Sequence, residues 1–330
     1  MRVARSLALV VLFLGVSSWL IPPGARGQSA PGDQYPSRSV RVVVPYTPGG
    51  GNDILARVVI ARAVADMGRS TVVDNRPGGN TTIGTQMVAR AAPDGYTLLT
   101  VDNAYTTGPS VQLSLPYDTL KDFVRITMIA NTSPIWVVHP SVPAKSAREL
   151  IALAKKQPGQ LAFGSTGSGT TGHLAFAQLK LATGLDAIHV PYKGGAPQVT
   201  ALLSGEVSML LAVPAGLLPH IKTGRMRPLA VSGSKRLAAL PALPTLTEAG
   251  IPVVVEAFWG AVAPAGTSAA IVSRLHESIE RALKYPDIRA RLDEMQFQPV
   301  GSPPAQFETF VQSEVTRWVS VVRAAGVKVE

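Results

Sequence analysis

Four glycine-rich segments hold the residues best suited to bind a ligand, and they span 48–51, 77–81, 164–172 and 193–195. Each lies between an expected strand end and an expected helix start. Glycine lets the backbone approach a ligand closely, and the following helix offers free N–H groups with partial positive charge. One such segment is more often an ordinary tight turn. Four together predict a site for an anion such as a carboxylate, with no arginine required.

Sharper motifs do not fit the longest of these segments. Its G-x-G-x-x-G at 167–172 formally matches a dinucleotide fingerprint, but no Asp or Glu follows the next expected strand to hold a ribose. Thr170 stands where a phosphate loop needs lysine, and Ser165 and Ser168 lack the paired glycines of a nucleophile elbow. These hydroxyls suit hydrogen bonding better than nucleophilic attack.

Signatures of metal and enzymatic chemistry are missing from the sequence. The five histidines, at 139, 173, 189, 220 and 276, are far apart, and there is no HExxH motif, no His/Asp cluster and no cysteine. We therefore expect no catalytic residue, no metal site and no cofactor. His173 is the exception, because it follows the long glycine segment. It either faces the ligand or packs as a capping histidine, and both interpretations stay open.

Polar and aromatic side chains beside the glycine segments have two interpretations each. Asp53 follows three glycines, where an acid usually caps free helix N–H groups and less often contacts a ligand. Tyr46, Tyr105 and Tyr192 lie beside loops, so one of them could cover a ligand, although plain packing suits each of them. Trp259 is expected in the core or at a hinge.

Short β-branched runs, glycines and helical patterns alternate along the chain, which predicts an α/β fold. Expected strands at 40–44, 71–73 and 96–101 are followed by a second series at 135–138, 161–163, 187–190 and 208–213. Beyond Phe258 the chain is expected to be mostly helical and to pack back on the first domain. The predicted domains are 34–133 plus 260–330, and 134–259, with crossings near Pro134 and Trp259.

The first 27 residues are predicted to be an export signal. Arg2 and Arg5 precede an apolar stretch over 7–20, whose 14 residues are too few to span a bilayer. Cleavage is expected before Gln28, with Ala30 as a second candidate. The mature chain is therefore expected to be exported, soluble and not membrane-spanning, and it is long enough for two cores.

Net charge is strongly basic, at +10 for the whole chain. Removing residues 1–27 takes away three arginines and no acid, which leaves +7. The basic residues are spread singly, with no run of four, so a solvated basic surface fits better than a nucleic-acid footprint. No nucleic-acid partner is expected, and the charge would favour capture of an anion.

The chain resembles the Bug (TctC-like) family, the periplasmic binding components of tripartite tricarboxylate transporters. The likeness covers nearly the whole mature chain, and it rests on many motifs in one order. They are VVPYTPGGGND at 43–53, NRPG at 75–78, ARAAPDGYTLL at 89–99, LPYD at 115–118, GSTGSG at 164–169 with His173, VPYKG at 190–194 and PTLTEAG at 244–250.

This resemblance implies a type II periplasmic binding protein, or Venus flytrap, with two mixed-sheet domains and no catalysis. A small carboxylate would be gripped by loops of both domains, partly through backbone amides and ordered water, and passed to the membrane subunits of the transporter. Carried over by position, the contacts would be Tyr46, Gly50, Gly51 and Asp53 on the first domain and Ser165, Thr166, Gly167, Ser168, Thr170 and His173 on the second. Tyr192 and Lys193 would line the cleft.

One departure from the family pattern affects the ligand. Where relatives often carry Gly-Ala-Gly-Gly, this chain has GGNTTIG at 78–84, so Asn80, Thr81 and Thr82 add donors and bulk near the expected ligand. An aliphatic dicarboxylate, citrate, an acidic amino acid and an aromatic carboxylate all remain open. A periplasmic sensor for a signalling receptor is the alternative role, and a secreted hydrolase is a further one.

Overall fold

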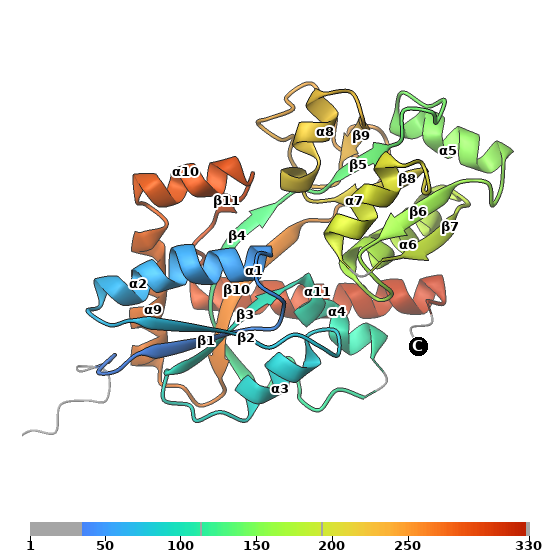
Figure 1. The fold of residues 1–330 in the computed structure, drawn as a ribbon. Helices are drawn as coiled ribbons and strands as arrows, with labels where there is room; N and C mark the ends of the chain where they lie inside the picture. The colour runs from blue at the N-terminus through green and yellow to red at the C-terminus, as the bar shows by residue number, and fades with distance from the viewer. Residues whose placement is uncertain (1–34, 113, 193, 328–330) are drawn as a thin grey trace, which may run out of the picture.

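Two separate β-sheets organise the computed structural model, which describes residues 35–112, 114–192 and 194–327 (Figure 1). Sheet A has six strands in the order β11-β4-β10-β3-β1-β2, and sheet B has five in the order β7-β6-β8-β5-β9. Both sheets mix parallel and antiparallel pairs and are covered by helices, so the predicted α/β class with two mixed sheets is confirmed. The predicted signal segment and Lys193 lie outside the described residues.

The elements follow the chain in three stretches. The first builds most of sheet A: β1 (Val40–Val44), α1 (Gly51–Leu55), the π-helix η1 (Ala56–Ile60), α2 (Ala61–Asp66), β2 (Thr71–Asn75), α3 (Thr82–Ala89), β3 (Thr97–Asp102), α4 (Asn103–Val111) and β4 (Phe123–Thr132). The second builds sheet B: β5 (Ile135–Val138), α5 (Ala147–Lys156), β6 (Ala162–Ser165), α6 (Thr171–Thr183), β7 (Ile188–Pro191), α7 (Gly195–Leu203), β8 (Met209–Ala212), η2 (Pro214–Gly216), α8 (Leu218–Lys222) and β9 (Arg227–Val231). The third returns to sheet A: β10 (Ala257–Pro264), α9 (Ala269–Ala282), α10 (Pro286–Glu294), β11 (Gln298–Pro299) and α11 (Pro304–Ala325).

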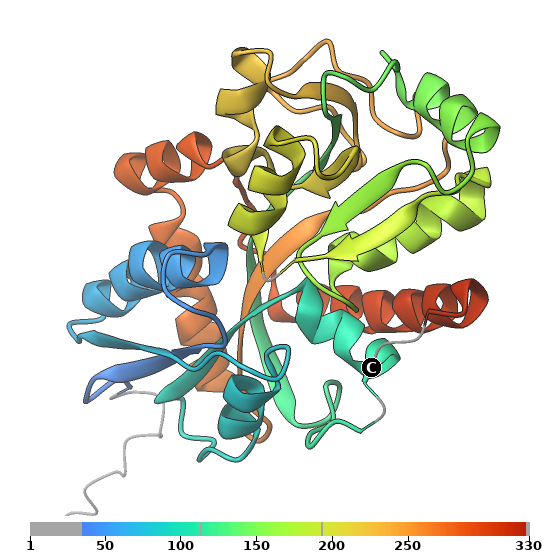
Figure 2. The same cartoon turned by 45° about the vertical axis from the view of Figure 1, so that its right-hand side comes forward.

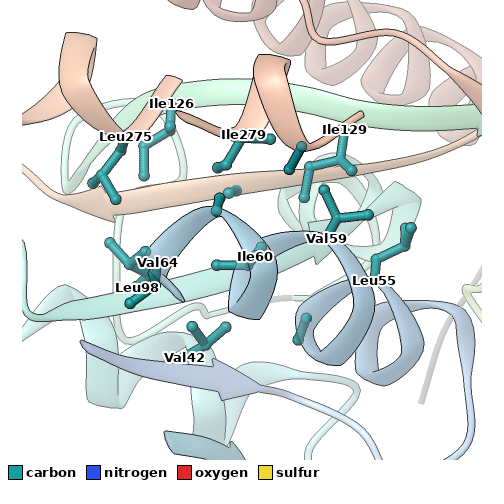
Figure 3. Packing of buried hydrophobic residues seen from close by; sticks show 14 of the residues in the cluster. Val42, Leu55, Val59, Ile60, Val64, Leu98, Ile126, Ile129, Leu275 and Ile279 are labelled. Atoms are coloured by element: carbon teal, nitrogen blue, oxygen red, sulfur yellow. The ribbon is translucent and has the colours of Figure 1, made fainter. Parts of the chain in front are cut away.

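Sheet A is buried on both faces because its strands carry apolar residues at successive positions. Val42 and Val44 of β1 pack on one face with α1, α2 and α9, a cluster seen in Figure 3. Val43 points to the other face, where it joins Phe307 and Val311 of α11. Alternate side chains of a strand point to opposite faces, so this nearly continuous apolar run anchors helices on both sides of the sheet.

Sheet B is built in the same way. Trp136 and Phe163 lie on the face covered by α5 and α6. Val137 and Leu210 lie on the opposite face, with α7 and the segment that leads into α8. The two faces together form a second buried core.

Polar contacts join the two passages of the chain between the sheets. Ser232 donates its backbone N–H to Pro134 O at 2.8 Å. The carboxylate of Glu256 accepts the Ser234 hydroxyl at 2.8 Å and the Asn131 amide at 3.3 Å. Asn131 belongs to β4 of sheet A, whereas Ser234 follows β9 of sheet B. Glu256 therefore ties together the segments that connect the sheets.

Helix α11 contacts both sheets, and not only sheet A as the sequence predicted for the tail. Its first half places Phe307 and Val311 in the core of sheet A. Further along, Trp318 is fully buried beside Trp136 in the core of sheet B. Within the described ranges, neither α11 nor any other helix is long and apolar enough to cross a membrane.

Three strands of sheet A, which are β4, β10 and the two-residue β11, were not predicted from the sequence, and neither was β9 of sheet B. The chain beyond Phe258 was expected to be mostly helical, but β10 runs through the middle of the sheet between β3 and β4, and the ten-residue β4 was also missed. β10 is buried on two faces and lacks the alternation of polar and apolar residues that marks a half-exposed strand, whereas β4 carries the buried polar residues Arg125 and Thr127 between its apolar residues. The N-cap of α1 is Gly50, two residues before Asn52.

Candidate functional site

The predicted binding loops follow the carboxyl ends of parallel strands in both sheets. β1 is parallel to β2 and β3, and β6 is parallel to β7 and β8, so each set of strands ends at one edge. Figures 1 and 2 show β1 and β6 pointing toward the region between the sheets. Val213, which directly follows β8, packs against the core of sheet A. The structure thus gathers the loops of both sheets in this region.

Free backbone donors begin the helices on both sides. The N-cap residues Gly50 and Thr170 make no side-chain cap, because Gly50 has no side chain and the Thr170 hydroxyl donates to Gly167 O at 2.8 Å instead. Across the described chain, the N–H groups of residues 51–53 and 171–173 find no acceptor. Such donors, together with the helix dipole, attract an anion.

A buried carboxylate that the sequence analysis overlooked organises the sheet A side. Asp102, at the end of β3, accepts the Tyr46 hydroxyl at 2.8 Å, the Asn52 amide at 2.9 Å and the Ala104 N–H at 2.9 Å. Burial raises the pKa of Asp102. Burial, and then the Asp102 charge, raise the pKa of Tyr46. The only sequence signal was the position of Asp102 as the N-cap of α4.

Asn52 retains one unused polar atom in this network. Its side chain is 3 % exposed, and its Oδ1 is enclosed with no hydrogen-bond partner in the described chain. The amide nitrogen of the same side chain is held by Asp102. Asn52 was not among the predicted contacts, yet it presents a free acceptor one residue before Asp53.

The carboxylate of Asp53 accepts hydrogen bonds from the first binding loop and from residues next to it. Its oxygens accept the Gly49 N–H at 3.0 Å, the Arg57 guanidinium at 3.0 Å and the Asn75 amide at 3.0 Å. Burial alone would raise the pKa of Asp53, but the hydrogen bonds from Arg57, Gly49 and Asn75 hold it below the usual value. The one backbone N–H that Asp53 accepts belongs to Gly49 and precedes α1, so Asp53 holds the loop in shape and does not cap the free helix N–H groups of residues 51–53.

Gly51 is packed against Trp259, whereas Gly50 is open. A Cβ on Gly51 would lie 2.7 Å from the indole nitrogen, whereas a Cβ on Gly50 would meet nothing within 4 Å. The indole stands against the Phe297 ring at 4.1 Å between centroids. Trp259 therefore sets the position of the loop, at the point where β10 leaves the connection between the sheets.

The departure from the family pattern at 78–84 is a turn with left-handed backbone at four successive residues. The φ angles are +124° and +57° at the glycines 78 and 79, +48° at Asn80 and +75° at Thr81. Thr82 donates its hydroxyl to Gln112 at 3.0 Å, and Thr81 is buried. Of the three side chains predicted to approach the ligand, Asn80 alone is exposed.

On the sheet B side, Ser165 is enclosed and its neighbours are open. Its hydroxyl accepts the Gly167 N–H at 3.2 Å and lies 2.6 Å from His189 Nε2. Thr166 and Ser168 are exposed, and the Ser168 hydroxyl has no partner in the described chain. Ser168 is thus free to meet a ligand, while Ser165 holds the loop.

The other predicted aromatic contacts are engaged elsewhere. Tyr192 donates its backbone N–H to Ser165 O at 2.9 Å and its hydroxyl to Glu206 at 2.8 Å. Tyr105 is 2 % exposed and donates to Thr119 O at 2.8 Å. The Tyr192 loop therefore touches the Ser165 loop, whereas Tyr105 is a core residue.

Two histidines lie together, which corrects the expectation that all five are far apart. His173 and His189 stack with ring centroids 3.8 Å apart and planes 9° from parallel. The Gly169 N–H donates to His173 Nδ1 at 3.0 Å. Burial lowers the pKa of His173, and burial together with His173 lowers that of His189 to about 4. Only the pairing of β6 with β7 brings His189 to the site, so no local pattern pointed to it.

Neither of two surface hollows is lined by these loops. One of about 320 Å³ lies beside Tyr35, Tyr96 and Ile271. Another of about 200 Å³ lies beside Glu256 and Phe310. The described residues also contain no group of three or more His, Asp or Glu side chains arranged to hold a metal ion. The helix N-termini with free N–H groups, rather than a closed cavity, mark the candidate site.

Known proteins resemble this chain over nearly its whole length. Residues 55–327 match the model of the tripartite tricarboxylate transporter family receptor. Protein BugT of Bordetella pertussis is 35 % identical over 334 aligned residues, which cover 100 % of both chains. The solved structure of R. palustris Rpa4515 with adipate is 34 % identical with a TM-score of 0.81, covering 89 % of this chain and 99 % of that one. MatC from Rhodopseudomonas palustris with bound malate is 29 % identical with a TM-score of 0.77, covering 87 % and 100 %.

Proposed function

The chain belongs to the tripartite tricarboxylate transporter receptor family, a family of periplasmic solute-binding proteins, and on that premise we propose that it captures a small dicarboxylate between its two sheets. The mature protein acts in the periplasm and passes its ligand to the membrane subunits of a tripartite tricarboxylate-type transporter. Adipate and malate, which are bound in two related structures, are both aliphatic dicarboxylates and support this ligand class.

One observation carries the proposal: the N–H groups of residues 51–53 and 171–173 have no acceptor in the described chain. They begin two helical runs that start from different sheets, and the partial charge of each run favours an anion. A carboxylate between them receives donors from both sides. The ligand contacts the backbone groups of Gly50, Gly51 and Gly167 and the side chains of Asn80, Ser168 and His173.

Other residues near the ligand act through the loops. The loops are shaped by Tyr46, Asp53, Ser165 and Thr170. They are bordered by Thr166, Thr81, Thr82, Tyr192 and Lys193.

Capture proceeds by closure about the two connections between the sheets. The domains are residues 34–133 with 260–330, and residues 134–259, and the contacts of Glu256 with Asn131 and Ser234 lie at their junction. A ligand stabilises the closed form only through contacts that the open form lacks. Donors from both domains on one carboxylate are contacts of this kind.

Thermal denaturation of the mature protein with a panel of carboxylates tests the ligand class. A ligand at 100 times its Kd stabilises the folded state by about 2.7 kcal/mol. We expect dicarboxylates to raise Tm and their neutral diamide and diol analogues to leave it unchanged. Stabilisation by neutral sugars alone, or turnover of any bound compound, would overturn the proposal.

Ser168→Ala tests the site by calorimetric titration with the best dicarboxylate. Because the Ser168 hydroxyl is exposed and has no partner in the described chain, its removal should weaken binding and leave stability unchanged. Ser273→Ala, at an exposed position of α9, is the matched control with unchanged affinity. Equal affinities of the two variants would remove Ser168 from the site.

A further inference from the structure

The hydrogen bond from Gly169 determines which nitrogen of His173 carries the proton. A backbone N–H always donates, so His173 Nδ1 must accept and is unprotonated in this arrangement. The single proton of the neutral ring then lies on Nε2. Nε2 has no hydrogen-bond partner in the described chain and is not enclosed, whereas His276 Nδ1 is enclosed. His173 thus presents an unused N–H donor in the first turn of α6.

His189 holds both His173 and the start of the loop. Its ring stacks on His173, and its Nε2 lies 2.6 Å from the Ser165 hydroxyl. Ser165 also accepts the Gly167 N–H at 3.2 Å and donates to Gly167 O at 3.1 Å. These three contacts are satisfied together when His189 Nε2–H donates to Ser165. Phe176, whose centroid is 6.4 Å from that of His189, backs the ring, and so His189 joins the loop to the helix.

A charge on His173 conflicts with this arrangement. Protonation of Nδ1 would point a new N–H group at the Gly169 N–H. Both groups would then be donors, and the hydrogen bond from Gly169 would be lost. It would also place a cation face to face with the ring of His189, 3.8 Å away. Burial of both rings acts in the same direction, because it lowers their pKa values. The neutral Nε2–H form therefore satisfies all contacts of the pair.

We propose that His189 is a positioning residue of the binding site: by holding the 165–169 loop through Ser165 and by stacking on His173, it keeps the Gly169 N–H on His173 Nδ1, so that His173 is an uncharged Nε2–H donor to a carboxylate oxygen of the ligand. This inference rests on the proposed function. It also predicts selectivity for carboxylates. The Nε2–H donor lies beside the free N–H groups of residues 171–173, so the site binds hydrogen-bond acceptors, whereas a carboxamide NH₂ or an ammonium group would place a donor against these donors.

Proton location on His173 can be measured without any ligand. Long-range ¹H–¹⁵N correlation spectra of the ¹⁵N-labelled mature protein at pH 7.5 distinguish the two neutral tautomers and the cation. We expect His173 in the neutral Nε2–H form. A proton on Nδ1, or a charged ring, would refute the proposal even if the protein binds dicarboxylates well.

Substitutions of His189 then separate positioning from packing. His189→Ala should shift His173 to a mixture of tautomers and weaken dicarboxylate binding about tenfold, the effect of one charge-assisted hydrogen bond. His189→Gln keeps an N–H donor for Ser165 and should restore most of the affinity. His220→Ala, at a half-buried position of α8 where the ring contacts Arg225, is the control without effect.

Two results would overturn the role of His189: an alanine variant with wild-type affinity, or one in which the His173 tautomer does not change. Circular dichroism of each variant establishes that it is folded before these results are compared. If the wild type bound no carboxylate, the proposed function would fall, while the spectra would still decide the ring geometry. The two failures are therefore distinguishable.

Discussion

Gly51→Ala tests how tightly Trp259 constrains the first binding loop. The added Cβ would lie 2.7, 2.8 and 2.9 Å from three indole atoms, which is closer than carbon atoms pack. Trp259 is 8 % exposed and stands against Phe297, so the ring has little room to retreat. The loop must shift instead, and such overpacking costs about 1–3 kcal/mol.

The matched control is the neighbouring glycine. Gly50 has φ −81°, which any residue adopts, and an added Cβ there meets nothing within 4 Å. In urea unfolding followed by circular dichroism, we expect Gly51→Ala to lower the free energy of unfolding by about 1–3 kcal/mol. Gly50→Ala should stay within about 0.5 kcal/mol of the wild type.

A double-mutant cycle shows whether Trp259 is the cause. In a Trp259→Leu background the indole is gone, so Gly51→Ala should cost much less than in the wild type. Because the shifted loop carries the N–H groups of residues 51–53, Gly51→Ala should also weaken dicarboxylate binding in calorimetric titration. The reasoning is refuted if Gly51→Ala is as stable as Gly50→Ala, or if its cost is the same in both backgrounds.

Two further predictions concern buried polar groups. Asp102→Ala leaves the Tyr46 hydroxyl, the Asn52 amide and the Ala104 N–H without their acceptor, and should cost about 2–4 kcal/mol in urea unfolding; a loss under about 0.5 kcal/mol would contradict the network. The pKa of His189 is about 4 in the folded protein and about 6.5 in an unfolded chain, so the unfolded chain binds more protons between these values. Stability should therefore be full above pH 6.5 and fall as the pH drops toward 4, with a smaller fall in His189→Gln; equal pH dependence of the two proteins would contradict this.

Much of the sheet and loop architecture was predictable because its signals are local. Val40–Val44 is a β-branched run followed by Gly49–Gly51, and the structure has β1, a loop and α1 there. Serine is a residue type that favours helix starts, and Ser146 caps α5 through its hydroxyl. The ordered motifs also indicated the family, which is confirmed. The domain bounds and the ligand contacts stay predictions.

Local patterns failed where burial or pairing decided the outcome. β10 lies between β3 and β4 with both faces covered, so the run AFWGAVAP has no alternation that distinguishes a strand from a buried helix. Asp102 acquires its role from Tyr46 and Asn52, which are about fifty residues away in the chain. Its sequence neighbours indicated only a helix cap.

Composition, periodicity and turn chemistry are contained in short stretches of chain, and the sequence by itself therefore determined where most strands end, where the glycine loops lie and which family the protein belongs to. Tertiary structure alone decided which distant side chains meet. The parallel pairing of β6 with β7 places His189 against His173 and Ser165, and the return of β10 to sheet A places Trp259 against Gly51. These contacts depend on strand order and on packing between segments far apart in sequence, and no short window of residues encodes either.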